Sequence, residues 1–232
     1  MQTQDIDYRA DTAMRGYLAF DEAKTGRRPG VAVFHEGLGL GEFAMARARM
    51  LAGLGYVALA ADMFGDRRQA RNLTEVAKLV GDLRAKPETL RGRGHAALAA
   101  LAALPDVDPG RMAAIGFCFG GSVVLELARA GADLKAAVSF HGVLTTRLPA
   151  VPGGVKASIL VLTGADDPLA PPEQVAAFEA EMRGTGAGLA ARQLRQHAAW
   201  LHQPGRRRFD AALRALQRTG RPALLGVDAE SF

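Results

Sequence analysis

The residue with the clearest capacity for chemistry is the one cysteine of the chain, Cys118, which lies in the segment A-A-I-G-F-C-F-G-G at Ala113–Gly121. An apolar, strand-like run ends at Gly116, and a helical pattern begins at Gly120. Glycines two residues before and after a nucleophile permit a sharp strand-to-helix turn, because larger side chains would collide there. The segment is the cysteine form of a nucleophile elbow, and it predicts that Cys118 is a nucleophile.

The helix that follows this turn would also assist the sulfur. Its free N–H groups and the positive end of its dipole point toward the turn and favour a thiolate. The backbone N–H of Phe119 is then a candidate oxyanion donor. Cys118 and its turn have two alternative interpretations. Cysteine is often a buried core thiol, and glycine-rich turns can bind phosphate, although this one lacks the Gly-Lys-Ser/Thr ending of a phosphate loop.

Acidic residues follow two other apolar runs. Asp166 and Asp167 come after I-L-V-L-T-G, and Glu36 comes after V-A-V-F-H. An acid after a late strand, downstream of the nucleophile, matches the chain order nucleophile–acid–histidine. Either aspartate could instead be a turn or helix-cap residue before Pro168, and Glu36 could be a solvated loop residue. Gly37 is the candidate for a second oxyanion N–H, because the loop after this strand supplies one in such folds.

The remaining pattern alternates strands with helices, which predicts a mostly parallel sheet with helices on both faces and catalytic groups at the carboxyl ends of the strands. A length of 232 residues suits a single α/β domain. The expected strands are Met14–Phe20 at an edge, Val31–His35, Tyr56–Ala61, Arg111–Gly116, Ala136–Phe140 and Ser158–Thr163, and the expected helices are Glu42–Leu54, Leu73–Ala85, Glu88–Leu104, Gly120–Gly131 and Pro172–Arg183.

Composition narrows the class of protein. The chain is 49% apolar and 23% charged, which is typical of a soluble globular protein. No apolar run approaches the ~20 residues of a membrane span. The first residues show no secretion signal, and a lone cysteine fits a reducing compartment, so we expect a cytoplasmic protein without a membrane partner.

The net charge of +5 is unevenly distributed. Residues 188–232 hold eight arginines and three acids, whereas the other 187 residues carry 21 basic and 21 acidic side chains. The main body therefore has no basic field to attract phosphate, and we expect no nucleic-acid partner. A nucleic-acid binder would depend on Arg206–Arg208 and its neighbours alone. We expect a monomer or a small homo-oligomer.

Five segments, in order, resemble the dienelactone hydrolase family, an α/β-hydrolase fold: H-E-G-L-G-L, G-Y-V-A-L-A-A-D-M-F-G-D, G-F-C-F-G-G, V-S-F-H-G and L-T-G-A-D-D-P-L-A-P-P-E-Q-V-A-A-F-E-A-E-M. The resemblance covers roughly residues 5–187. It implies a Cys-His-Asp triad that cleaves a carboxymethylenebutenolide-type lactone or another small carboxylic ester, without a metal or cofactor.

The same resemblance assigns roles to individual residues. It places the triad acid on Asp167 and leaves Asp166 as the turn residue. It places Glu36 beside Cys118, where a glutamate influences the ionisation of the thiol. His35 and His141 also end strands, and they are interpreted as supporting or core residues. His95, within a helix, is expected at the surface.

The chain departs from the family at residues 188–232, an atypical tail. The family has a strand resembling D-W-Q-L and then a loop H-G-F-T-N-P with the catalytic histidine. Aligning Pro204 places that position on Ala199, with His197 and His202 on either side. His202 is the candidate for the missing histidine, because it lies in the corresponding loop. Arg67 and Arg68 are expected near the pocket rim without an assigned role.

A frameshift would explain the tail. Codons permitted for Gly188–Pro204, taken one base later, spell D-W-Q-L-A-S-Y-G-N-T-R-H-G-F-T-N-P, which restores the family pattern. We therefore expect residues 188–225 to be poorly ordered and R-Q-L-R-Q-H to be a poor buried strand. The alternative function is a catalytically impaired hydrolase-fold protein that binds a small acid or a protein partner. The intact elbow argues against it, because a binding module has no use for a strained turn.

Overall fold

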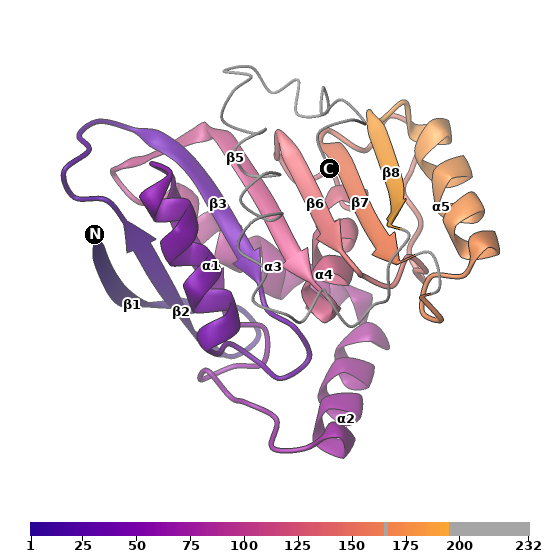
Figure 1. Cartoon of the computed structure of the whole chain (residues 1–232), viewed down its shortest axis with the longest axis horizontal. Coiled ribbons are helices and arrows are strands. Elements are labelled where there is room, and N and C mark those ends of the chain that lie inside the picture. The colour runs from indigo at the N-terminus through magenta and orange to yellow at the C-terminus, as the bar shows by residue number, and fades with distance from the viewer. Residues whose placement is uncertain (165–166, 195–232) are drawn as a thin grey trace.

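The computed structural model describes residues 1–164 and 167–194, which form a sheet with helices on both faces (Figure 1). The described strands are β1 (Gln2–Arg9), β2 (Ala13–Phe20), β3 (Arg28–Phe34), β4 (Val57–Ala61), β5 (Val107–Phe117), β6 (Ala136–Phe140), β7 (Ser158–Gly164) and β8 (Leu189–Leu194). The described helices are α1 (Glu42–Gly53), α2 (Leu73–Arg84), α3 (Pro87–Ala102), α4 (Phe119–Arg129) and α5 (Pro172–Thr185).

The strands lie in the order β1-β2-β4-β3-β5-β6-β7-β8. β2 pairs antiparallel with both β1 and β4, and every other neighbouring pair is parallel. The expected mostly parallel α/β architecture is therefore confirmed. Parallel strands all end at one edge of the sheet, so residues that follow β3, β5, β6 and β7 come together there.

Two strand predictions need correction. Met14–Phe20 was expected at an edge, but β1 covers it and forms the edge instead. The residues of β1 are almost all exposed, so they carry little of the apolar alternation by which strands are found. β5 was expected to begin at Arg111 and begins at Val107. Its pairing with β3 jumps from Asp108 to Met112, so Pro109 and Gly110 lie in an irregularity that interrupts the apolar pattern.

The segment expected to be a poor strand also differs from the prediction. Leu189–Leu194 forms β8 and pairs in parallel with β7, from Ile159 opposite Leu189 to Gly164 opposite Leu194. Leu189 and Ala191, two residues apart, both pack against the core, and this alternation accounts for the strand. Residues 195–225, the rest of the segment expected to be poorly ordered, lie outside the described residues.

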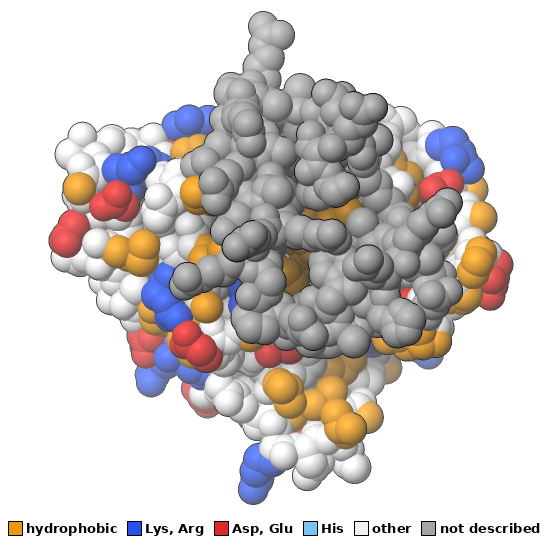
Figure 2. Space-filling view, viewed as in Figure 1, with side chains coloured by type: hydrophobic (Ala, Val, Ile, Leu, Met, Phe, Trp, Pro, Cys, Tyr) orange, Lys and Arg blue, Asp and Glu red, His pale blue; other side chains and the backbone are white. Residues whose placement is uncertain are grey.

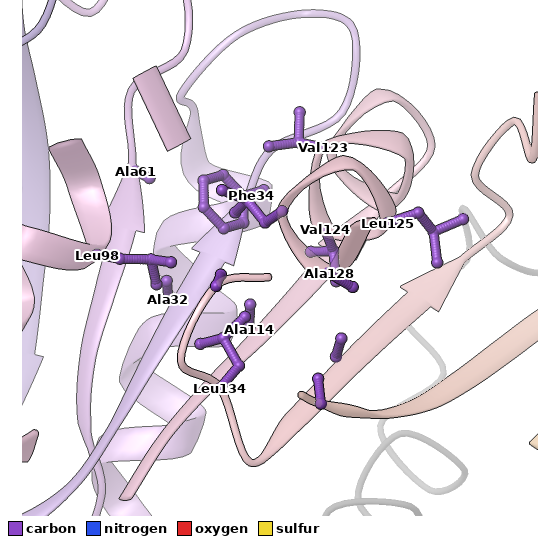
Figure 3. Close-up of a cluster of buried hydrophobic side chains, with 14 of the residues drawn as sticks. Ala32, Phe34, Ala61, Leu98, Ala114, Val123, Val124, Leu125, Ala128 and Leu134 are labelled. Atoms are coloured by element: carbon purple, nitrogen blue, oxygen red, sulfur yellow. The ribbon is translucent and has the colours of Figure 1, made fainter. Parts of the chain in front are cut away.

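Alternating side chains of the sheet divide the core into two clusters. Val31 and Val33 pack toward α1, whereas Ala32 and Phe34 join the larger cluster beneath α3, α4 and α5. In Figure 3, Phe34 of β3 lies near Val123 and Val124 of α4, and Ala32 lies beside Leu98 of α3. The first residue of α4 is thus held at the carboxyl end of β5 by packing along the whole helix.

A buried ion-pair network joins the helices of this second face. The guanidinium of Arg129, 1% exposed, pairs with Glu126 and with Glu181 of α5, and Glu126 also pairs with Arg91 of α3. Arg129 donates a hydrogen bond to the carbonyl of Leu144, 2.6 Å away. The Ala150 N–H donates to Glu181 at 2.9 Å. The network therefore fixes the connection between β6 and β7 against three helices.

The described surface in view mixes basic and acidic side chains around its rim (Figure 2). This agrees with the balanced charge of residues 1–187. Hydrophobic side chains gather at the lower end of the view, over α2, where Leu73 is 82% exposed. In the described part of the chain, no helix is long and apolar enough to cross a membrane.

Replacing Arg129 tests the network. Arg129→Met leaves the buried carboxylate of Glu126 and the half-buried carboxylate of Glu181 with one partner fewer, so we expect a loss of about 3–5 kcal/mol in the free energy of unfolding, measured by urea denaturation. Arg183→Met is the control, because Arg183 is 69% exposed and pairs with Glu179 at the surface. Its effect should stay within about 0.5 kcal/mol. Equal effects of the two substitutions would contradict a structural role for the network.

Candidate active site

The turn at Cys118 has the geometry that its glycines predict. Cys118 adopts φ 53° and ψ −113°, a strained conformation for a residue with a side chain. A Cβ on Gly116 would lie 2.0 Å from the carbonyl oxygen of Gly120, and one on Gly120 would lie 2.1 Å from that of Phe34. Glycine is therefore required at both positions, because the start of α4 touches both β5 and β3.

Phe119 is the first residue of α4, so its N–H has no acceptor within the helix. Its ring is buried, stacks on Phe64 at 5.6 Å between centroids, and lies 5.9 Å from the ring of His35. These contacts fix the backbone beside the sulfur. They hold the Phe119 N–H at the start of α4, next to Cys118.

The neighbouring strand brings a histidine to the same place. Phe117 and Phe140 pair across β5 and β6, and their rings stack with centroids 4.7 Å apart. The Cys118 N–H donates to the carbonyl of Phe140 at 2.9 Å. The next residues of the two strands, Cys118 and His141, therefore lie side by side, and His141 also has a positive φ, 56°.

His141 contacts two chemically active groups. Its Nδ1 lies 2.5 Å from Oδ2 of Asp167, and its side chain is hydrogen-bonded to Cys118. The hydrogen bond with Cys118, together with the bond to and charge of Asp167, outweighs burial and raises the pKa of His141 to about 9. Cys118, His141 and Asp167 thus form a connected chain of titratable groups at the carboxyl ends of β5, β6 and β7.

Of the residues singled out in the sequence, Cys118 and Asp167 are brought together through His141. Asp167 is buried, 3% exposed, and its carboxylate faces a histidine. It also accepts a hydrogen bond from the Leu169 N–H at 2.9 Å, a turn contact that the sequence analysis assigned to Asp166. The contact of His141 with Cys118 was not foreseen. Asp166, His197, Ala199 and His202 lie outside the described residues.

His35, expected to be a supporting or core residue, lies in the core. The ring is fully buried, and its Nδ1 lies 2.6 Å from the carbonyl oxygen of Glu36, to which Nδ1–H donates. Its Nε2 accepts from the Met63 N–H at 3.2 Å. Burial lowers the pKa of His35, so the ring is neutral and joins the ends of β3 and β4. His95, expected at the surface, is half-buried on α3.

Glu36 is half-buried, which corrects the alternative of a fully solvated loop residue. Its Oε2 is enclosed and has no hydrogen-bond partner among the described residues. Burial raises the pKa of Glu36, and the charge of Arg47 opposes that rise. The adjacent Gly37 packs against α2, because a Cβ there would lie 2.8 Å from Val76. The proposed second oxyanion donor therefore lies in a closely packed loop.

The two arginines expected near the pocket rim have partners of their own. Arg67 pairs with Asp5 at 2.5 Å and donates to the carbonyl of Gly16 at 2.8 Å. Arg68 pairs with Glu75 at 2.6 Å. These contacts tie the loop after β4 to the first two strands and to α2. Within the described part of the chain, no cluster of three or more histidine, cysteine or acidic residues could hold a metal ion.

Comparison with known proteins shows the family of this chain. Residues 14–203 match the model of the dienelactone hydrolase family. A "Putative carboxymethylenebutenolidase" of Yersinia pestis is 30% identical over 182 residues, which cover 74% of this chain and 67% of that protein. The chain belongs to the dienelactone hydrolase family and is a hydrolase of that type.

Solved structures give the same result. The structure of m3DLH matches with a TM-score of 0.83 and 40% identity, over 88% of this chain and 85% of that one. A dienelactone hydrolase-like promiscuous phosphotriesterase from metagenomic libraries matches with a TM-score of 0.77 and 42% identity, over 83% of this chain and 81% of that one.

The enclosed carboxylate of Glu36 leads to a stability prediction. A carboxyl group whose pKa is raised by folding destabilises the protein at neutral pH, and this penalty disappears below the ordinary pKa of glutamate. Glu36→Gln should therefore raise the free energy of unfolding at pH 7 by about 1 kcal/mol, and the gain should vanish near pH 4. Urea denaturation at both pH values measures it. The exposed Glu42, replaced by Gln, is the control; a gain as large in that variant would contradict the argument.

Proposed function

We propose that this chain hydrolyses a small carboxylic ester or lactone through a covalent acyl intermediate on Cys118. The observation that carries the proposal is the position of Cys118, on a strained turn at the start of α4 and in contact with an imidazole that Asp167 holds. Strained turns persist where the surroundings over-determine them, and they cluster at active sites. The family and the name of the Yersinia pestis relative support a lactone of the carboxymethylenebutenolide type.

The proposed chemistry follows the order of the groups. The thiolate of Cys118 attacks the carbonyl carbon, and the N–H groups of Phe119 and Gly37 stabilise the oxyanion that forms. A histidine gives its proton to the departing oxygen and leaves a thioester on the enzyme. Water then attacks the thioester, and the histidine returns the proton to the sulfur as the acid product leaves. No metal or cofactor has a part in this proposal.

Glu36 has a secondary part in the proposal. A buried carboxylate near the nucleophile would oppose a second negative charge, so its protonation would favour the thiolate. The raised pKa of Glu36 is in the direction that this role requires. The histidine that the sequence analysis assigned, His202, lies outside the described residues.

A second substrate class comes from one neighbour. The phosphotriesterase at 42% identity indicates phosphotriesters as candidates for this chain as well. A phosphotriester is already tetrahedral, and its phosphoryl oxygen would lie where the oxyanion of an ester intermediate lies. Paraoxon is a suitable probe, and phosphorylation of Cys118 would be the expected product.

Replacing the nucleophile tests the proposed function. Cys118→Ala should lower kcat for p-nitrophenyl acetate and for a dienelactone by about 10³–10⁶-fold. In the unchanged protein, mass spectrometry of the quenched reaction should find the acyl group on the Cys118 peptide, since the chain has no other cysteine. Ser158→Ala, at the start of β7, is the control for a remote hydroxyl.

Two other outcomes would contradict the proposal. Full activity of Cys118→Ala would exclude covalent catalysis by the thiol. Absence of hydrolysis, combined with saturable binding of a small acid, would favour the impaired-hydrolase alternative.

A further inference from the structure

We propose that His141 is the histidine that accepts the proton of Cys118 in this chain, so that the nucleophile, histidine and acid follow three neighbouring strands. The inference rests on the proposed role of Cys118 as the nucleophile. It differs from the sequence assignment, which looked for the histidine after the last strand of the sheet.

Strand register places Cys118 and His141 side by side. β5 and β6 are adjacent and parallel, and the pair Phe117–Phe140 stands immediately before Cys118 and His141. Both following residues have a positive φ, 53° and 56°. Such a conformation is strained for a residue with a side chain and persists only when the surrounding structure imposes it. Two of them side by side hold the sulfur and the imidazole against each other.

Asp167 orients the imidazole ring of His141. The Asp167 side chain is 1% exposed, and its Oδ2 takes the Nδ1–H of His141 at 2.5 Å. Its other oxygen is held by the Leu169 N–H. Because Nδ1 is occupied, Nε2 is the nitrogen left for the sulfur. A carboxylate that fixes one nitrogen of an imidazole and leaves the other for the nucleophile is the arrangement that catalysis needs.

The backbone that carries the imidazole of His141 is held on both sides. The His141 N–H donates to the carbonyl of Leu162 at 2.8 Å. The next residue, Gly142, lies so close to α4 that a Cβ there would be 2.6 Å from the carbonyl carbon of Gly121. The Val143 N–H donates to Oγ of Ser122 at 3.0 Å. The imidazole therefore stands on a backbone fixed by β7 on one side and α4 on the other.

The proton balance is simple. The S–H bond of Cys118 breaks as an N–H bond forms at Nε2 of His141, which yields a thiolate and an imidazolium paired with Asp167. When the alkoxide leaves the tetrahedral intermediate, Nε2 gives the proton to its oxygen. A water molecule that attacks the thioester returns one proton to Nε2, and that proton passes to the sulfur.

The groups that face the imidazole agree with this role. Among the described residues, Cys118 from the start of α4 and Asp167 from the loop after β7 are the titratable groups that act on it. Both favour the protonated ring, which should keep its proton at neutral pH and lose it as the pH rises through about 9.

Alkylation of Cys118 tests the pair without requiring a substrate. We expect iodoacetamide at pH 7 to react about tenfold more slowly with His141→Gln than with the unchanged protein, because a free thiol is only slightly ionised at that pH. His95→Gln is the matched control and should react at the unchanged rate, since His95 lies within α3. His202→Gln is the competing variant: a slow reaction there, with a normal rate in His141→Gln, would overturn the proposal.

If His141→Gln does not fold, a spectroscopic measurement on the unchanged protein tests the proposal. In ¹⁵N NMR of the histidine rings of the unchanged protein, one imidazole should titrate near pH 9, and Cys118→Ala should lower that midpoint. If no histidine titrates near pH 9 and Cys118→Ala changes no midpoint, the proposal is also overturned.

These results separate the inference from the proposed function. Ester hydrolysis that requires Cys118 and is unchanged in His141→Gln would refute the role of His141 and leave the hydrolase in place. A rapid, His141-dependent alkylation without hydrolysis of any ester would refute the proposed function and leave the Cys118–His141 pair.

Discussion

The contact of the first turn of α4 with the backbones of β3 and β5 is the constraint on which the site depends. Gly120 approaches the carbonyl of Phe34 so closely that no side chain fits between them. The chain must therefore turn sharply at Cys118, which places this residue at the positive end of a helix. The stack of Phe119 on Phe64 and the neutral, buried His35 hold the two strand ends that this turn touches.

A second constraint acts on the other side of the nucleophile, at the connection after β6. This connection carries His141 and then runs beneath α3, α4 and α5, where Arg129 and Arg91 hold its carbonyls. Buried ion pairs add little net stability compared with apolar packing, because removing two charges from water is costly. Their value here is geometric: the arginines fix a non-repetitive segment that lies directly after the imidazole. The same helix, α4, thus positions the nucleophile with its first turn and the histidine-bearing connection with its last.

The sequence predicted the parts of this site that are marked by a local pattern of residues. The elbow is a local pattern of glycines around Cys118, and the strand ends at Glu36 and Asp167 are marked by apolar runs, so these positions were found directly. The proposed role of His141, in contrast, depends on which strands are neighbours in the sheet. It depends on β5 and β6 being adjacent and on Phe117 standing opposite Phe140, and neither follows from the residues of one strand. The segment V-S-F-H-G does show a histidine directly after a buried strand. The family pattern, however, has its catalytic histidine after the last strand, in the tail. β1 was missed for a related reason, since pairing with β2 rather than burial forms it.

The arrangement also bears on whether the fold is used for catalysis or for binding alone. A protein that only binds gains nothing from strained backbone at Cys118 and His141, from an enclosed acceptor on Glu36, or from a carboxylate buried beneath an imidazole. The strained turns and the enclosed acceptor of Glu36 lower stability, and natural proteins keep such costs mainly where function requires them. Cys118, His141 and Asp167 come together at the carboxyl ends of β5, β6 and β7. The three strands belong to the part of the chain in which the family pattern is intact, so the chemistry argued for Cys118 does not depend on how the atypical tail arose.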